Sequence, residues 1–179
     1  MRHLASALLL AALAFGGTGC RAAADNPDPA VSDPKGRRTA TGAWFGDSVD
    51  LRGSARGERL RMRVKGWVDP AVPVRTGAEP EDGTRWVGAE VELVNVGGRA
   101  YDLAGGALHA FDGTGTRYRP VRTGTLTTGS PLAWGSLAAG EQKTGWLVFA
   151  VPEKARIVRV LGTVGEATAG WRLQHPPSR

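Results

Sequence analysis

The residues with the most regular chemical spacing are four cations, Arg59, Arg61, Arg63 and Lys65, at every second position of one segment. On a β-strand, side chains two residues apart leave the same face about 6.6 Å apart, at twice the ~3.3 Å rise per residue. The four cations, called here the basic ladder, would suit an anionic cell-wall polymer or acidic lipid headgroups. The alternative is an ordinary solvent face, because Lys and Arg on an edge strand also discourage aggregation.

The single cysteine, Cys20, follows a segment with the features of an export signal. Residues 1–19 have a short polar start, an apolar run over residues 4–15 and then a glycine-rich end, and we predict that they form a signal peptide. The apolar run would span about 18 Å as a helix at ~1.5 Å per residue, well short of the ~30 Å hydrocarbon layer of a membrane. It is therefore too short for a permanent span.

Gly19-Cys20 resembles the lipoprotein signal of bacteria, in which the cysteine receives a thioether-linked diacylglycerol and becomes the new N-terminus. Gly17 departs from that pattern, which usually has an aliphatic residue three positions before the cysteine. The resemblance implies a protein held on the outer face of the cell membrane by lipid on Cys20, since two or three acyl chains anchor stably. The alternative is cleavage after Ala24, which would discard Cys20 and secrete the chain.

The candidate catalytic segment is Gly46-Asp47-Ser48, which resembles the nucleophile block of one class of lipases and esterases. A serine nucleophile needs a base, and only His109 and His175 remain after the signal is removed. Neither lies in a recognisable base motif, so we expect no enzymatic activity. A hydrolase would require Ser48 within hydrogen-bond reach of one of these histidines.

No metal or cofactor site is predicted. One cysteine excludes zinc sites with two or more thiolates from this chain, as well as an intramolecular disulfide. The acidic turn at residues 79–82 lacks the regular ligand spacing of a calcium loop. Three tryptophans near the ends of expected elements are candidates for a surface that stacks on sugar rings: Trp44, Trp67 and Trp134.

Length and composition favour one folded domain. The chain has 179 residues, 41% of them hydrophobic, which is enough for one packed core. The net charge is +6, and removal of Arg2 with the signal leaves +5. Nucleic acid is not an expected partner, because the predicted address lies outside the cytoplasm and no aromatic platform interleaves the basic ladder.

The chain divides into four predicted regions. Residues 1–19 are the signal, and residues 20–45 are a lipid-anchored flexible linker because proline, aspartate and alanine predominate there. Residues 46–175 form the domain and residues 176–179 a C-terminal tail. The linker is either a spacer that holds the domain off the membrane or a terminal segment whose length has no role.

The domain shows short runs of period two separated by Gly, Pro and Asp, with no amphipathic helix. Leu60, Met62, Val64 and Val68 are expected on one buried face, opposite the basic ladder. About seven or eight strands in roughly 130 residues indicate an all-β fold, an immunoglobulin-like antiparallel β-sandwich, with a small barrel as the alternative. The expected strands are 48–54, 59–68, 87–93, 107–111, 116–121, 142–151, 156–161 and 169–173.

Three groups of motifs occur in order along the domain: Trp86 to Asn95, Tyr101-Asp102-Leu103 with Phe111 to Tyr118, and Leu137 to Glu141 with Gly145 to Pro152. Together they resemble an extracellular domain-of-unknown-function family found in lipoproteins of Gram-positive bacteria. The resemblance covers most of residues 46–161 and implies an immunoglobulin-like fold and an extracellular address, without catalytic residues.

The function expected from these observations is a non-enzymatic, lipid-anchored binding or structural module at the cell surface. Its partners would be the membrane through Cys20 and an anionic cell-wall polymer or a surface protein. The alternative is a solute-binding lipoprotein that serves a transporter or sensor. A solute binder should contain an apolar pocket of hundreds of Å³, whereas a filled sandwich with a charged exterior favours the interaction module.

Overall fold

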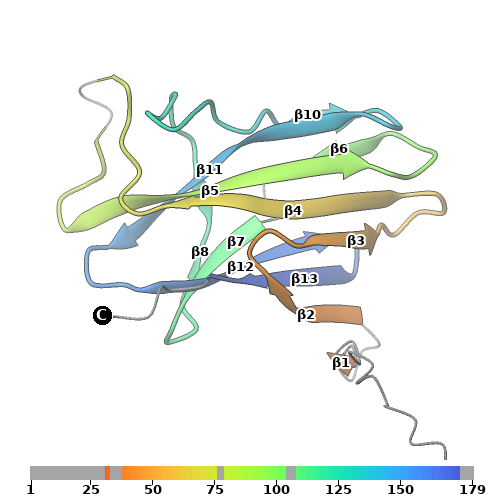
Figure 1. The fold of residues 1–179 in the computed structure, drawn as a ribbon, viewed down its shortest axis with the longest axis horizontal. Helices are drawn as coiled ribbons and strands as arrows, with labels where there is room; N and C mark the ends of the chain where they lie inside the picture. Colours follow the sequence, from red (N-terminus) through yellow and green to blue (C-terminus); the bar gives the residue numbers. More distant parts are fainter. Residues whose placement is uncertain (1–30, 33–37, 76–78, 104–107, 174–179) are drawn as a thin grey trace, which may run out of the picture.

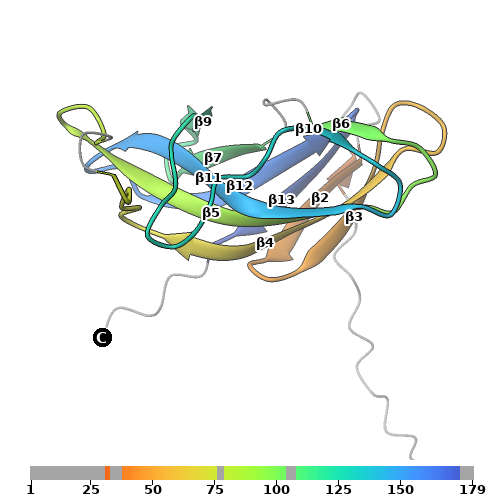
Figure 2. The ribbon, with the colours of Figure 1, turned by 90° about the horizontal axis from the view of Figure 1, so that it is seen from above.

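A computed structural model describes residues 31–32, 38–75, 79–103 and 108–173, and it shows a β-sandwich (Figure 1, Figure 2). The predicted signal peptide, Cys20, Ala24, His175 and the C-terminal tail lie outside the described residues. No helix among the described residues has the length and apolar character needed to cross a membrane. The strands are β1 (Val31–Ser32), β2 (Arg38–Trp44), β3 (Ser48–Arg52), β4 (Arg59–Val68), β5 (Thr84–Asn95), β6 (Tyr101–Leu103), β7 (Leu108–Asp112), β8 (Arg117–Tyr118), β9 (Pro120–Val121), β10 (Gly135–Leu137), β11 (Gln142–Pro152), β12 (Ile157–Val164) and β13 (Ala167–Arg172).

Two large sheets form the layers of the sandwich. One has the order β1-β2-β13-β12-β7-β8, the other β3-β4-β5-β11-β9, and β10 pairs with β6 in a short ribbon. All strand pairings are antiparallel except that of β2 with β13, which is parallel. The prediction of a sandwich rather than a barrel is confirmed, whereas its purely antiparallel character is wrong at this one pairing.

The first sheet extends into the region predicted as a flexible linker. β2 covers residues 38–44 and lies between β1 and β13, so the domain begins before residue 46 and the predicted boundary is wrong. Backbone hydrogen bonds hold a strand near a sheet edge without large apolar side chains. For this reason the polar composition of residues 38–42 did not reveal the strand.

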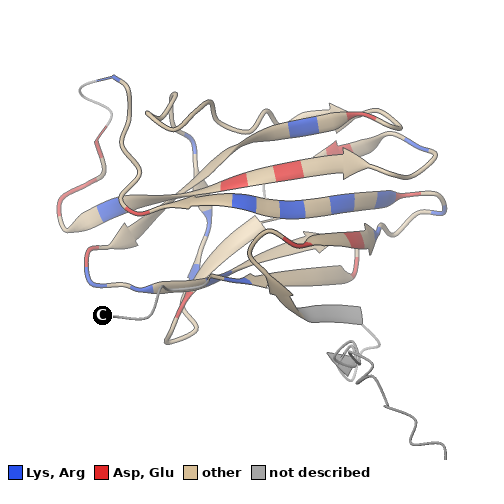
Figure 3. Cartoon of the chain, viewed as in Figure 1, with Lys and Arg blue, Asp and Glu red and all other residues tan. Residues whose placement is uncertain are grey.

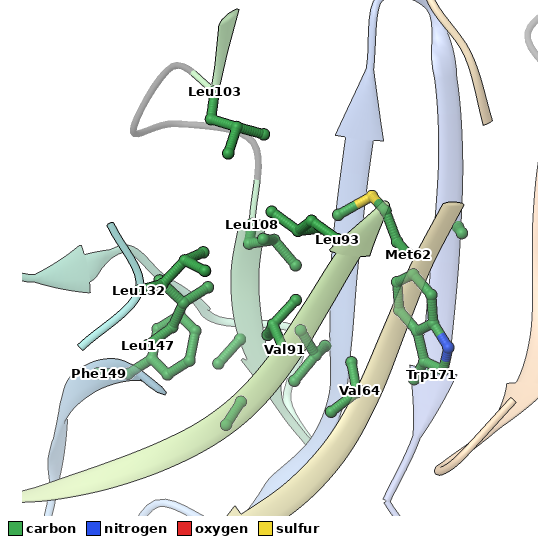
Figure 4. Close-up of a cluster of buried hydrophobic side chains, with 14 of the residues drawn as sticks. Met62, Val64, Val91, Leu93, Leu103, Leu108, Leu132, Leu147, Phe149 and Trp171 are labelled. Carbon is green, nitrogen blue, oxygen red and sulfur yellow. The ribbon is translucent and has the colours of Figure 1, made fainter. Parts of the chain in front are cut away.

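The main core lies between the two large sheets, as Figure 4 shows for part of it. Its largest fully buried side chains are Trp171 of β13 and Phe149 of β11, both with no exposed area. Around them, β4, β5 and β12 contribute alternate residues, which is the pattern that predicted these strands. Each large apolar side chain buried in this way contributes about 1.5–3 kcal/mol.

A β-bulge in β4 changes which residues face the core. The pairing with β5 shifts between Val64 and Gly66, so one extra residue enters β4 at this point. Trp67 consequently packs against the main core, while Val68 packs on the outer face of the sheet. The prediction that Val68 shares a face with Val64 is therefore wrong, because strict alternation ends at a bulge.

A second, smaller cluster covers part of the outer face of β5 and β11. Ala71, Trp86, Leu126 and Val148 are buried there, beneath residues from two long connections. β11 is buried on both sides, because Leu147 and Phe149 enter the main core while Val148 enters this cluster.

Candidate functional site

The basic ladder lies on the outer face of the five-stranded sheet, as predicted, but carboxylates stand beside it (Figure 3). Asp50 of β3 accepts hydrogen bonds from Arg61, with Nε 2.6 Å from Oδ1, and from Arg59, with Nη2 3.3 Å from Oδ2. The hydrogen bond from Arg61 holds the pKa of the Asp50 carboxyl below its usual value, and the charge of Arg59 adds to this effect.

The other two cations of the ladder also have partners. Lys65 Nζ lies 3.4 Å from Glu92 Oε2 on β5, and Arg63 Nε donates to the carbonyl oxygen of Gly46 at 2.6 Å. Cross-strand pairing with β3 and β5 is what places these groups together. The ladder is thus part of a mixed-charge network rather than a free cationic stripe, and a polyanion would compete with its internal partners.

The chain between β9 and β10 passes over the edge of β11 and creates a surface hollow of about 320 Å³. We call this feature the loop hollow. Its apolar lining includes two prolines and two tryptophans, and Arg122 and Thr123 supply polar groups. The residues of its apolar wall are Pro120, Val121, Pro131, Leu132, Trp134, Trp146 and Leu147.

Main-chain contacts fix the position of this segment on the sheet. Leu132 N donates to the Trp146 carbonyl oxygen at 2.9 Å, and Trp146 N donates to the Ser130 carbonyl oxygen at 2.9 Å. Gly145 permits the close approach, because a Cβ there would lie 2.5 Å from Leu132 Cα. The indole of Trp146 donates through Nε1 to the Thr128 carbonyl oxygen at 3.2 Å. The walls of the loop hollow are therefore held by hydrogen bonds and packing.

The tryptophans expected at the surface have different environments. Trp44 is 48% exposed, whereas Trp67 and Trp134 are half-buried and pack against the main core. Trp134 also lines the loop hollow, together with Trp146 of β11. The sequence did not predict the loop hollow, because a long connection forms it. The alternation of apolar and polar residues identifies strands and gives no information on such connections.

Ser48 and His109, the two candidate catalytic residues that the structure describes, do not come together. Ser48 pairs with Arg63 on the outer face of the five-stranded sheet, whereas His109 lies on β7 of the opposite sheet. The side chain of His109 faces outward because Leu108 and Ala110 on either side are buried. Within the described residues, no group of three or more His, Cys, Asp or Glu could hold a metal ion.

Two buried polar residues have structural partners. Asn95 Nδ2 donates to the carbonyl oxygens of Arg99 and Leu137, which links β5 to the β6–β10 ribbon. Asp112 begins the turn between β7 and β8, where it accepts hydrogen bonds from the hydroxyl of Thr114 at 2.7 Å and from the hydroxyl of Tyr118 at 2.8 Å. Hydrogen bonds to the carboxylate lower the pKa of Asp112 to about 2, and the bond from the Thr114 side chain has the largest effect.

Residues 55–161 match the family described as Domain of unknown function (DUF4352). The chain belongs to this family. The matched region runs from the β3–β4 turn to within β12. It therefore includes the basic ladder, the loop hollow and the two buried polar residues, Asn95 and Asp112. The resemblance drawn from the sequence motifs is confirmed. No curated protein matches the chain.

Solved structures confirm the fold. A secreted protein of Mycobacterium tuberculosis, MPT63, has a TM-score of 0.56 at 18% identity, and the match covers 75% of this chain and 97% of that one. The yjhA protein of Bacillus subtilis has a TM-score of 0.50 at 15% identity, with 74% of this chain and 99% of that one covered. At these identities the similarity establishes a shared β-sandwich and leaves function to the residues themselves.

Proposed function

We propose that this chain is a lipid-anchored, extracytoplasmic binding domain without catalytic activity, and that the loop hollow is its recognition surface. The observation that carries the proposal is the composition of the hollow, in which Trp134 and Trp146 stand beside Pro131 and the exposed Arg122. An apolar, aromatic lining with a few polar groups is the usual composition of a binding site. Loops on a rigid β-scaffold are also where binding residues concentrate.

The address outside the cytoplasm is supported by the predicted signal peptide at residues 1–19 and by the secreted state of the mycobacterial neighbour. Lipidation at Cys20 would explain why the chain has one cysteine, placed directly after that signal. The competing outcome is cleavage after Ala24 and release as a secreted protein.

The absence of catalysis is proposed because Ser48 and His109, the candidate nucleophile and the candidate base among the described residues, occupy opposite outer faces of the sandwich. Ser48 and His109 belong to different sheets with the main core between them. Asp112, whose pKa is strongly lowered, is committed to a turn and faces the sheet interior. These positions leave binding as the function that the described geometry supports best.

A site-specific cross-link on intact cells tests the recognition surface. A photoreactive residue replaces Val121, which lines the loop hollow and is 38% exposed. The matched control places the same residue at Glu166, an exposed position in the β12–β13 turn of the other sheet. We expect one cross-linked partner from position 121 and none from position 166. Equal capture from both positions, or none from either, would exclude the hollow as the recognition surface.

A small solute is the second candidate ligand, because about 320 Å³ reaches the lower end of the ~300–1,000 Å³ typical of small-molecule sites. Native mass spectrometry of protein extracted from its own membranes measures this directly. A stoichiometric small molecule that is lost in a Trp134→Ala variant would favour the solute-binding lipoprotein. Protein that carries no bound small molecule would favour a macromolecular partner.

The lipid anchor has its own test. The mass of the mature N-terminal peptide should correspond to an acylated Cys20, and a Cys20→Ser variant should leave the membrane fraction. A mature N-terminus at Asp25 would instead establish secretion.

A further inference from the structure

A row of five side chains crosses the outer face of the six-stranded sheet, perpendicular to its strands. Backbone pairing brings one residue from each of five neighbouring strands into register. With strands ~4.8 Å apart, the row extends about 19 Å. In order from β2 to β8, this arginine row consists of Trp44, Arg172, Arg159, Phe111 and Arg117.

All members of the arginine row point away from the main core. Their neighbours along the strands point inward: Val160 and Trp171 have no exposed area, and Tyr118 packs against the core. Arg117, Arg159 and Arg172 are exposed, and Trp44 is 48% exposed. The row is thus a surface feature, formed by residues that are far apart in the sequence.

Aromatic rings position two of the three guanidinium groups. Arg159 Cζ lies 4.9 Å from the centroid of the Phe111 ring, and Arg172 Cζ lies 6.0 Å from that of Trp44. A guanidinium over an aromatic face keeps its N–H edges available for other partners. Arginines held in this way lose less side-chain freedom when they bind a phosphate in a bidentate manner.

No ion pair among the described residues involves the three arginines of the row. At one end of the row, Asp47 accepts a hydrogen bond from Trp44 N at 2.7 Å. Arg159 and Arg172 stand directly opposite each other on antiparallel strands, an arrangement in which like charges destabilise a sheet. Among the strands β2, β7, β8, β12 and β13, the single acidic residue is Asp112, which is buried. The basic ladder differs, since Asp50 and Glu92 stand within it.

A histidine lies beside the row. His109 is two residues before Phe111 and faces the same side of β7. Burial, and after it the charges of Arg117 and Arg119, lower the pKa of His109, so the imidazole is mostly neutral at pH 7 and the positive charge of this face comes from its arginines.

We propose that this face of the six-stranded sheet, centred on the arginine row, docks flat on the anionic lipid headgroups of the membrane. Arginine recognises headgroup phosphates, and an exposed tryptophan such as Trp44 is typical of the membrane interface. The inference rests on the proposed lipid anchor, because a tether keeps a weakly binding face at high local concentration. β2, which carries Trp44, is also the first long strand after Cys20 in the sequence.

Sedimentation with lipid vesicles tests the proposal on the unlipidated chain from Arg21 to Arg179. The probe is phosphatidylcholine vesicles with about one third phosphatidylglycerol, compared with pure phosphatidylcholine. We expect binding to the anionic vesicles alone, weakened about 30-fold by R159S/R172S, since each lost cation near the surface lowers binding about fivefold. The matched control R61S/R63S removes the same charge from the basic ladder and should weaken binding less than threefold.

Equal loss in the two double variants would overturn the assignment to this face. Binding of the parent chain to soluble poly(glycerol phosphate) but not to vesicles would overturn it in favour of a wall polymer. If R159S/R172S fails to fold, R117S provides the second test, because it removes one arginine of the row and should weaken binding about fivefold. Because the vesicle assay uses no lipid anchor, its failure is distinct from a failure of Cys20 acylation.

Discussion

Replacement of Gly145 with alanine should lift the chain that forms the loop hollow away from the sheet. A Cβ at this position would lie 2.5 Å from Leu132 Cα and 2.6 Å from Leu132 N. Both are main-chain atoms, so no side-chain rotation can relieve the contact and the backbone around Leu132 must move.

The cost of that movement can be worked from the contacts it breaks. Two backbone hydrogen bonds join residues 130–132 to Trp146, and each is worth about 0.5–1.5 kcal/mol. Leu132 is 3% exposed, and exposing such a side chain costs about 1.5–3 kcal/mol. We expect the free energy of unfolding to fall by about 2–5 kcal/mol, because relaxation will retain part of these contacts.

Urea denaturation followed by tryptophan fluorescence measures this change. Gly124 provides a matched control within the same connection, since a Cβ there would have no heavy atom within 4 Å. Gly124→Ala should alter stability by less than about 0.5 kcal/mol. If Gly145→Ala is equally mild, the close packing of residues 130–132 on β11 is wrong. G145A should also abolish any cross-link formed from position 121.

Three further outcomes follow from the polar groups. For Asp112→Asn, the loss of thermal stability should be largest above pH 4 and should shrink as the pH falls toward 2. The reason is that the pKa of the carboxyl is about 2 in the native state and 3.8 in the unfolded state. A difference in Tm that does not depend on pH would contradict this. Asn95→Ala should lower the unfolding free energy by about 2–4 kcal/mol, because the Leu137 carbonyl loses its donor in a buried site, and a chemical denaturation curve checks it. Asp50→Asn should cost less than about 1 kcal/mol by the same measurement, since its partners Arg59 and Arg61 are half exposed.

The two cationic surfaces show what a one-dimensional pattern can reveal. The basic ladder is visible in the sequence because its members alternate within one strand. Its partners Asp50 and Glu92 come from neighbouring strands, and their register is set by pairing that no local pattern specifies. The arginine row was not predicted because each of its residues comes from a different strand.

The same distinction applies to the bulge and to β2. Alternation identified β4, yet the extra residue between Val64 and Gly66 reverses the two faces beyond it. Backbone pairing with β13 holds β2 in the sheet, although its sequence lacks the alternating apolar residues from which a strand is predicted.

The sequence alone determined the fold class and most of the strands, because period-two burial and the turn residues that bound it are local properties. The tertiary structure decided where the two proposed binding surfaces lie. The loop hollow needs residues 120–134 laid over β11, and the arginine row needs five strands in register. Sites of both kinds arise from long-range pairing and packing, whose geometry depends on the complete chain.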